Sequence, residues 1–184
     1  NGKIVKGQQI VARAWVDEEF KKELLSDPAK AASKIGIQTS NYSTDVSTHP
    51  HKKSDKEDQF LKDFAHGHTE LRVVEDTEKV KNLVVCTLCS CYPASVLGMS
   101  PEWYKSRAFR SRSVADPRGM LKDEFNLIVP KDVSLHVHDS NAEMRYLVLP
   151  RRPANTEGWS EEELQKIVTR DSMIGVEEIK VRSK

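Results

Sequence analysis

Apolar residues recur near helical spacing at the start of the chain, which predicts an amphipathic helix from Gln8 to Leu25. A second helix is predicted from Ala29 to Ile35, because Asp27 can cap it and Pro28 suits its first position. The glycine that follows is a typical stop signal. We interpret residues 1–37 as a helical arm with a single apolar stripe. Such an arm is expected to pack against its own domain or against a partner chain.

Residues 38–70 have a different composition, rich in Thr, Ser, Asn, Asp, Lys and His. Their one short apolar patch contains Phe60, Leu61 and Phe64. This composition is typical of a connecting segment. We therefore predict a linker that contains at most one short helix.

After the linker the pattern changes to alternating and β-branched residues, which favour strands. Strands are predicted at four places: Leu71–Val74, Leu83–Val85, Ser134–Asp139 and Arg145–Leu149. Three helices are predicted: one opened by Ser100 and Pro101 that carries Trp103 and Tyr104, one opened by Asp116 and Pro117, and one from the Ser160 capping box through Thr169. The fold class is therefore α+β, with residues 71–184 as a mixed domain of strands and helices.

Composition and charge narrow the possible partners. Of the 184 residues, 38% are hydrophobic and 31% are charged, which is enough apolar material to bury one core. The 29 Lys and Arg residues against 28 Asp and Glu residues give a net charge of +1, which argues against nucleic acid or an anionic membrane as a partner. No apolar run approaches the roughly 20 residues of a membrane-spanning helix. The start Asn1-Gly2-Lys3 lacks the apolar core of a secretory signal, so we expect a cytoplasmic protein.

The cysteines lie together at Cys86, Cys89 and Cys91. A disulfide scaffold would instead spread an even number of cysteines along the chain. Because Cys89 and Cys91 flank a single residue, the peptide nitrogens of Ser90 and Cys91 lie between their sulfurs. Two sulfurs and two nitrogens can then chelate a metal ion in one plane, while Cys86 binds from an axial side. The cluster is therefore predicted to be a metal site.

Other sites can also be built from three cysteines. A zinc site needs four ligands in a tetrahedron, and the fourth would have to be a distant His or Asp. A redox pair of Cys86 and Cys89 would normally start a helix in a thioredoxin-like unit and would leave the third thiol without a role. Thiolates and deprotonated amides instead suit a trivalent ion, Co(III) or Fe(III). Five such donors leave one position open, where a Lewis acid can polarise a substrate.

The loop Cys86-Thr87-Leu88-Cys89-Ser90-Cys91 resembles the metal-binding signature of the α subunit of nitrile hydratase, and Thr87 at its second position is typical of the cobalt type. The similarity extends over nearly the whole chain and is weakest in the linker. Further segments match the family pattern: Ala12–Asp17, Val96–Gly98, Pro101–Ser106, Arg145–Pro150, Thr156–Ser160 and Val168–Gly175. The resemblance implies the fold of that α subunit, in which an N-terminal helical arm precedes a layered α/β-sheet domain.

The resemblance also implies roles for the loop residues. Cys86 would be the axial thiolate, Cys89 would be oxidised to a sulfinate and Cys91 to a sulfenate, and the amide nitrogens of Ser90 and Cys91 would complete the cobalt site. A nitrile nitrogen would take the open position. The sulfenate oxygen of Cys91, or a water that it activates, would attack the nitrile carbon to give the amide. Ser90 would donate a hydrogen bond near the oxidised sulfurs.

The family also suggests what surrounds the loop. Asp139, Glu143 and Arg145 match positions of a polar network around the site, although they could equally form ordinary surface ion pairs on a solvated strand and turn. Tyr92 and Ala94 are expected to line the substrate pocket. Ala94 stands where the family usually has Trp, and this smaller side chain predicts a roomier pocket for a bulky nitrile.

The same resemblance implies that the chain works with partners. These are a nitrile hydratase β subunit, or two smaller β-like subunits, and an activator protein that inserts cobalt. Two alternatives stay open. The run Asp139-Ser140-Asn141 is similar to the metal-bearing subunit of thiocyanate hydrolase, which has the same kind of loop. The chain could also be a metal-free precursor or a non-catalytic subunit, in which the thiols would be reduced.

Overall fold

The computed structural model describes residues 5–39, 69–89 and 91–181. The helices are α1 (Lys6–Val16), α2 (Glu18–Ser26), α3 (Pro28–Lys34), α5 (Ala94–Leu97), the 3-10 helix η2 (Glu102–Lys105), α6 (Arg107–Ala115), α7 (Pro117–Phe125), α8 (Glu161–Ile167) and α9 (Arg170–Ile174). The strands are β1 (Glu70–Glu75), β2 (Val80–Val85), β3 (Ser134–Asp139) and β4 (Met144–Leu149). Ser90 and most of the predicted linker lie outside the described residues. Among the described residues, no helix combines the length and apolar character needed to cross a membrane.

The strands form two parallel pairs, β1 with β4 and β2 with β3. Parallel strands need a crossover connection, and here α5, η2, α6 and α7 all lie between β2 and β3 in the chain. The register places Val85 beside Asp139 where β2 and β3 end. The chain therefore leaves β2 and enters the cysteine loop directly beside the end of β3.

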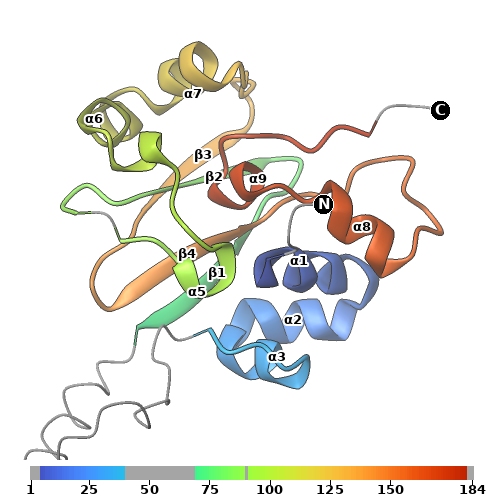
Figure 1. The fold of residues 1–184 in the computed structure, drawn as a ribbon. Coiled ribbons are helices and arrows are strands. Elements are labelled where there is room, and N and C mark those ends of the chain that lie inside the picture. Colours follow the sequence, from blue (N-terminus) through green and yellow to red (C-terminus); the bar gives the residue numbers. More distant parts are fainter. Residues whose placement is uncertain (1–4, 40–68, 90, 182–184) are drawn as a thin grey trace, which may run out of the picture.

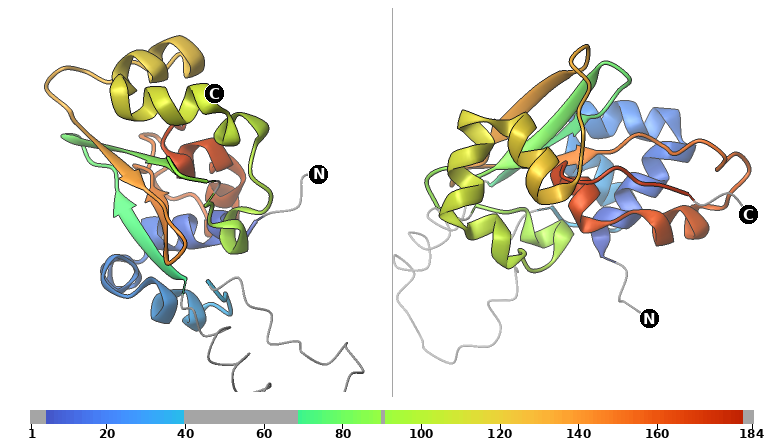
Figure 2. Two further views of the ribbon diagram at one scale, coloured as in Figure 1. Left: turned by 90° about the vertical axis from the view of Figure 1, so that its left-hand side faces the viewer. Right: turned by 90° about the horizontal axis from the view of Figure 1, so that it is seen from above.

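The strands lie between two groups of helices (Figures 1 and 2). Helices α2 and α3 contact β1, while α6 contacts β2 and α7 contacts β3 on the other side. One continuous apolar cluster joins the two groups: Ile10 and Leu24 from the N-terminal helices pack in the same core as Leu83, Leu147 and Phe109, all with no exposed surface. The N-terminal helices thus pack against the rest of their own chain, which was one of the two expected arrangements.

The long helix predicted from Gln8 to Leu25 is wrong, because Asp17 divides it into α1 and α2. The Asp17 backbone is extended, and its Oδ1 accepts a hydrogen bond from the Phe20 N–H at 2.9 Å. Asp is preferred as an N-cap residue, where its carboxylate satisfies an otherwise unpaired backbone N–H. The cap predicted at Asp27 is confirmed, since its Oδ1 accepts from the Lys30 N–H at 3.1 Å.

Two other predicted boundaries are also wrong. Ser100 does not cap the segment that carries Trp103, which is only the single turn η2; Ser106 instead caps the unpredicted helix α6 by accepting from the Phe109 N–H at 3.1 Å. The helix predicted through Thr169 ends at Ile167, and Thr169 caps the separate helix α9. In both cases a Ser or Thr begins a new helix because its oxygen takes up a free N–H.

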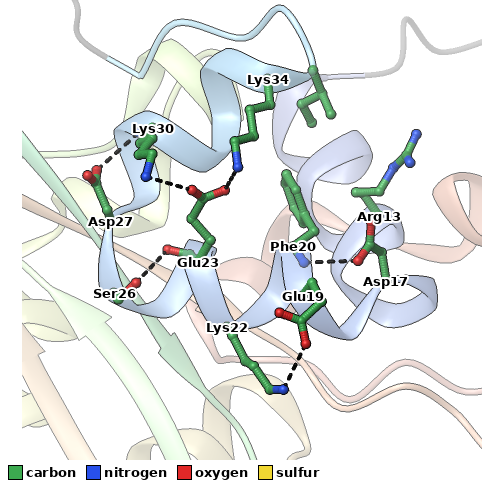
Figure 3. Close-up of a pocket in the computed structure, with 11 residues that line it drawn as sticks. Arg13, Asp17, Glu19, Phe20, Lys22, Glu23, Ser26, Asp27, Lys30 and Lys34 are labelled. Carbon is green, nitrogen blue, oxygen red and sulfur yellow. Dashed lines mark hydrogen bonds and ion pairs between the residues drawn. The ribbon is translucent and has the colours of Figure 1, made fainter.

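A cavity of about 600 Å³ opens beside α1, α2 and α3 (Figure 3). Five of its charged side chains pair with one another: Glu23 accepts from Lys30 at 3.1 Å and from Lys34 at 2.5 Å, and Lys22 pairs with Glu19 at 2.9 Å. None of the three cysteines lines it. This cavity is therefore a groove between packed helices, and the candidate functional site lies at the cysteine loop instead.

Candidate metal centre

Strand β2 delivers the cysteine loop. Lys81 to Val85 are buried, and Cys86 follows the strand with no exposed surface. The chain then bends outward and back, because Leu88 is 87% exposed while Cys91 is only 9% exposed. This bend brings the sulfurs of all three cysteines within 4.8 Å of one another. The cysteines thus converge on one point, as their spacing predicts.

The distances between the sulfurs indicate what kind of metal ion would fit. Cys86 Sγ lies 3.2 Å from Cys89 Sγ, and Cys89 Sγ lies 2.9 Å from Cys91 Sγ. On an ion bound at about 2.3 Å, two thiolates would lie about 3.3 Å apart at a right angle and about 3.8 Å apart in a tetrahedron. The observed separations therefore favour a square or octahedral arrangement over tetrahedral zinc.

Asp139 holds the first turn of the loop from the end of β3. Its Oδ1 accepts a hydrogen bond from the Thr87 N–H at 2.9 Å, and its Oδ2 accepts from the Thr87 hydroxyl at 2.5 Å. The neighbouring Ser140 N–H donates to the Val85 carbonyl at 2.7 Å. A carboxylate that accepts two hydrogen bonds from one residue fixes that residue's orientation. The end of β3 therefore sets the direction in which the chain leaves Cys86.

Residues that follow the loop in the chain hold its carbonyl groups. The buried Tyr104 hydroxyl donates to the Cys91 carbonyl at 2.9 Å. Arg110 Nη1, from α6, lies 3.4 Å from both the Thr87 carbonyl oxygen and the Cys89 carbonyl oxygen and donates to both. The loop is thus fixed through its backbone carbonyl groups.

Burial and charge act on the thiol of Cys91 in opposite directions. Burial is the main cause that raises its pKa to about 12, and its hydrogen bond with Cys89 adds to this, while the Arg145 guanidinium lowers it. Burial also raises the pKa of Tyr104, which keeps its hydroxyl protonated as a hydrogen-bond donor. A cysteine binds a metal ion as the thiolate, so metal binding at Cys91 has to displace the proton of its thiol.

A shallow cavity of about 300 Å³ opens beside Cys89 and Cys91. The other residues that line it are Tyr92, Ala94, Ser100, Lys105 and Arg145. It therefore includes both predicted pocket residues and two cations, and its lining contains no carboxylate. Glu143, predicted in the same network as Arg145, is exposed on the turn before β4 and does not line this cavity.

The pair His136 and His138 lies away from any such cluster. His136 is exposed, and His138 is half-buried with its Nε2 2.8 Å from Asn82 Oδ1. Within the described part of the chain, the cysteines are the one group of three or more His, Cys, Asp or Glu residues placed to share a metal ion. The hydrogen bond to Asn82 gives His138 an ordinary structural role.

Sequence reasoning missed Arg110 and placed Tyr104 on a predicted helix without a contact to the loop. Tyr104 packs in the core, with its ring centroid 5.1 Å from that of Tyr92, but its hydroxyl also reaches the loop. One signal was available in the sequence. Arg107 and Arg110 are three residues apart, so on a helix they share a face, and two cations on one face close to a thiolate cluster indicate an electrostatic role.

Comparison with known proteins is consistent with this geometry. The family model described as nitrile hydratase, alpha chain, matches residues 2–177. The cobalt-containing nitrile hydratase subunit alpha of Pseudonocardia thermophila is 45% identical over 174 residues, which cover 95% of this chain and 72% of that protein. The cysteine cluster is thus the metal centre of a chain that resembles one subunit of a heteromeric enzyme.

Two solved structures show the same fold. A double mutant of the Fe-type nitrile hydratase from Comamonas testosteroni Ni1 has a TM-score of 0.77 at 33% identity, covering 95% of this chain and 72% of that chain. A recombinant thiocyanate hydrolase with partially modified cobalt centres has a TM-score of 0.77 at 40% identity, covering 96% and 74%. The relatives therefore include cobalt and iron proteins and two kinds of substrate.

Proposed function

The chain belongs to the nitrile hydratase alpha-chain family, and from this membership we propose that it is the metal-bearing subunit of a cobalt enzyme that hydrates nitriles to amides. The observation that carries the proposal is the convergence of Cys86, Cys89 and Cys91 beside an open cavity, with sulfur separations that suit right-angled ligands. Thr87 in the second position of the loop and the 45% identity to a cobalt-containing relative support cobalt rather than iron.

The proposed ligands are the sulfurs of Cys86, Cys89 and Cys91 and the amide nitrogens of Ser90 and Cys91. When bound there, a trivalent ion supplies a Lewis-acidic vacancy that makes a nitrile carbon electrophilic. Cys91, oxidised to a sulfenate, provides the attacking oxygen or positions the attacking water, and Ser90 donates a hydrogen bond to the oxidised sulfurs. Cys89 is the proposed sulfinate.

Charge around the loop supports this assignment. Five anionic donors around a trivalent ion leave a net negative charge, which needs nearby cations in a partly buried site. Lys105 and Arg145 line the cavity next to Cys89 and Cys91, and Arg145 already lowers the pKa of Cys91. These two cations therefore offset charge on the side from which a neutral nitrile would enter.

Ala94 bears on the size of the substrate. Its exposed methyl group lies in the lining of the cavity beside Cys91, at the position where the family usually has Trp. The site is proposed to accept a bulky nitrile such as a heterocyclic one. In A94W the ratio of kcat/KM for a large aromatic nitrile to that for a small aliphatic nitrile should fall about tenfold or more, because an added indole removes contacts and space. An unchanged ratio would contradict the proposal.

A partner subunit is proposed to cover the loop. Its support is that relatives of the chain are subunits of heteromeric enzymes, and Leu88 and Met99, which are 87% and 88% exposed within the loop and shortly after α5, would lie on the covered surface. The partner is a nitrile hydratase β subunit or two smaller β-like subunits, with an activator protein for cobalt insertion. Co-expression should yield a stable complex that is active, whereas the isolated chain should have little activity.

Thiocyanate is the second candidate substrate. The fold matches a thiocyanate hydrolase with a TM-score of 0.77 at 40% identity, and the cavity beside the sulfurs is lined by two cations and no carboxylate, which would suit an anion. Parallel assays of the complex with an organic nitrile and with thiocyanate separate the two functions. Turnover of thiocyanate alone would replace the nitrile proposal.

The decisive experiment combines cobalt quantification with mass spectrometry of the cysteine peptide from the purified complex. One cobalt per chain, with one added oxygen on Cys91 and two on Cys89, is the expected result. Unmodified thiols without metal would instead identify a precursor or a non-catalytic subunit. Tetrahedral zinc in the mature complex would overturn the proposal.

A further inference from the structure

Arg110 contacts the one described carbonyl group that is bonded directly to a proposed nitrogen ligand. The carbon of the Cys89 carbonyl is covalently bonded to the nitrogen of Ser90, so both belong to the same peptide bond. Arg110 Nη1 donates to the oxygen of this peptide at 3.4 Å and to the Thr87 oxygen at the same distance. A guanidinium group therefore contacts the oxygen of the peptide whose nitrogen is a proposed metal ligand.

Resonance connects the two ends of that peptide. The C–N bond has partial double-bond character because nitrogen electrons are shared with the carbonyl oxygen. When the nitrogen binds a metal, it releases its proton to solvent, and part of the negative charge moves to the oxygen. Hydrogen bonds from a cation to an anionic acceptor are roughly twice as strong as neutral ones. Arg110 would therefore bind the Cys89 oxygen more strongly after metal binding than before.

The surroundings of Arg110 keep it in this place. Its Nε atom is buried and has no hydrogen-bond partner among the described residues, so the contacts that hold the guanidinium are those of Nη1 with the two loop carbonyls. It lies in a cleft together with Thr87, Arg107 and Asp139. The Asp139 carboxylate could compete for the guanidinium, but it is already engaged by the N–H and hydroxyl of Thr87.

We infer that Arg110 is a positioning residue for the metal centre, which acts by offsetting charge on the Cys89 oxygen when the attached nitrogen becomes a ligand. The inference rests on the proposed ligand set and adds a residue to it. Arg145 is on the side of the cavity, near Cys91, and Arg110 is on the side of α6. Two arginines of the same chain thus lie near the loop that is proposed to become anionic.

The test compares four versions of the cobalt-loaded complex: the parent, R110Q, R110K and R107Q. Glutamine can donate a hydrogen bond but carries no charge, while lysine keeps the charge. Arg107 is the matched control, because it lies one helical turn earlier in the same cleft and donates to no loop carbonyl among the described residues. Two quantities are measured: the rate of cobalt loss to EDTA and the sulfur-to-cobalt charge-transfer absorption.

R110Q is expected to lose cobalt about 10- to 100-fold faster than the parent, as for other residues that support metal ligands, and to show a shifted absorption band. R110K and R107Q should both stay close to the parent. Parent-like cobalt retention and absorption in R110Q would overturn the inference. Parent-like cobalt retention in R110Q together with fast cobalt loss in R110K would overturn it as well. If R110Q does not assemble, the test uses R110K alone. Fast cobalt loss from the R110K complex would overturn the inference, because lysine keeps the charge.

The parent complex separates this outcome from a failure of the proposed function. A parent that holds no cobalt, or holds it only through cysteine sulfurs, refutes the proposed ligand set whatever Arg110 does. A parent that holds cobalt firmly through the Ser90 nitrogen, together with an unaffected R110Q, refutes only the role of Arg110.

Discussion

Each end of the β2–β3 pair has an aspartate that accepts several hydrogen bonds, but the two lie in opposite surroundings. Near the start, Asp76 is 5% exposed and accepts from Lys81 Nζ at 2.6 Å, from the Asn82 N–H at 2.8 Å and from Asn82 Nδ2 at 3.0 Å. At the end, Asp139 is exposed and accepts from the N–H and hydroxyl of Thr87. A carboxylate that accepts several hydrogen bonds thus occurs once in the interior and once at the surface.

The difference teaches that surroundings decide what a carboxylate does. A buried charge without its partner is costly, so the contacts of Asp76 must persist for the chain to stay folded. An exposed carboxylate can be rehydrated when its contacts break, so Asp139 contributes little to stability. Its contribution is to the shape of the loop. The start of the β2–β3 pair therefore supports the fold, and its end positions the proposed metal ligands.

The largest effect is expected from D76A. This change removes three hydrogen bonds and leaves the Lys81 ammonium buried without its partner, so the free energy of unfolding should fall by about 3–5 kcal/mol. Urea denaturation of the metal-free chain measures it. K81M serves as the control, because Asp76 then keeps both bonds from Asn82 and the loss should be smaller. Equal losses would show that the ion pair alone stabilises this end.

D139N is expected to weaken cobalt retention and to leave the stability of the fold nearly unchanged, which is the reverse of D76A. The amide keeps one acceptor oxygen for Thr87, but it loses the charge and the second acceptor. Cobalt retention and activity should fall about 10- to 100-fold, while the free energy of unfolding changes by less than about 1 kcal/mol. A large loss of stability without loss of cobalt would break the contrast between the two ends.

Y104F tests the buried hydrogen bond from the Tyr104 hydroxyl to the Cys91 carbonyl, with an expected effect between those of D76A and His138 protonation. It leaves the Cys91 carbonyl without its buried donor, so the free energy of unfolding should fall by about 1–2 kcal/mol. Cobalt uptake should also slow, because the Cys91 peptide is less firmly oriented. Y92F is a useful comparison, since the Tyr92 hydroxyl has no hydrogen-bond partner among the described residues and its loss should cost less. A larger loss in Y92F would contradict this account.

The smallest effect should come from protonation of His138. Burial is the main cause that lowers its pKa, His136 lowers it further, and Asp76 raises it. The unfolded chain then binds the proton more readily, so this contribution to stability is present above the unfolded pKa of about 6.5 and is lost as pH falls through the folded pKa.

Urea denaturation between about pH 7.5 and pH 5 would measure this contribution, which is lost between the unfolded pKa of about 6.5 and the lower folded pKa. The parent should lose more stability on acidification than H138Q, in which the titrating group is absent. H136Q is the control, because the His136 side chain is exposed and its removal should leave most of the pH dependence of the parent. An equal pH dependence in parent and H138Q would contradict the assignment to His138.

Local signals in the sequence predicted much of the fold. The strand predicted at Ser134–Asp139 is confirmed in full, and the caps at Asp27 and Asp116 are confirmed by their hydrogen bonds. These features depend on neighbouring residues only. Ser106 and Thr169 carry the same kind of signal, but each lies in a polar stretch where several residues could act as caps, so the pattern alone did not select them.

The sequence by itself determined that the three thiols lie close along the chain, because cysteines at spacings of three and two residues can share one ion once the chain bends around it. Only the tertiary structure decided what holds them. Asp139, Arg110 and Tyr104 are 52, 21 and 13 residues from their partners in the loop. No periodicity or spacing encodes such contacts, since they exist only after β3 and α6 have packed against β2 and brought distant polar groups to the same side of the loop.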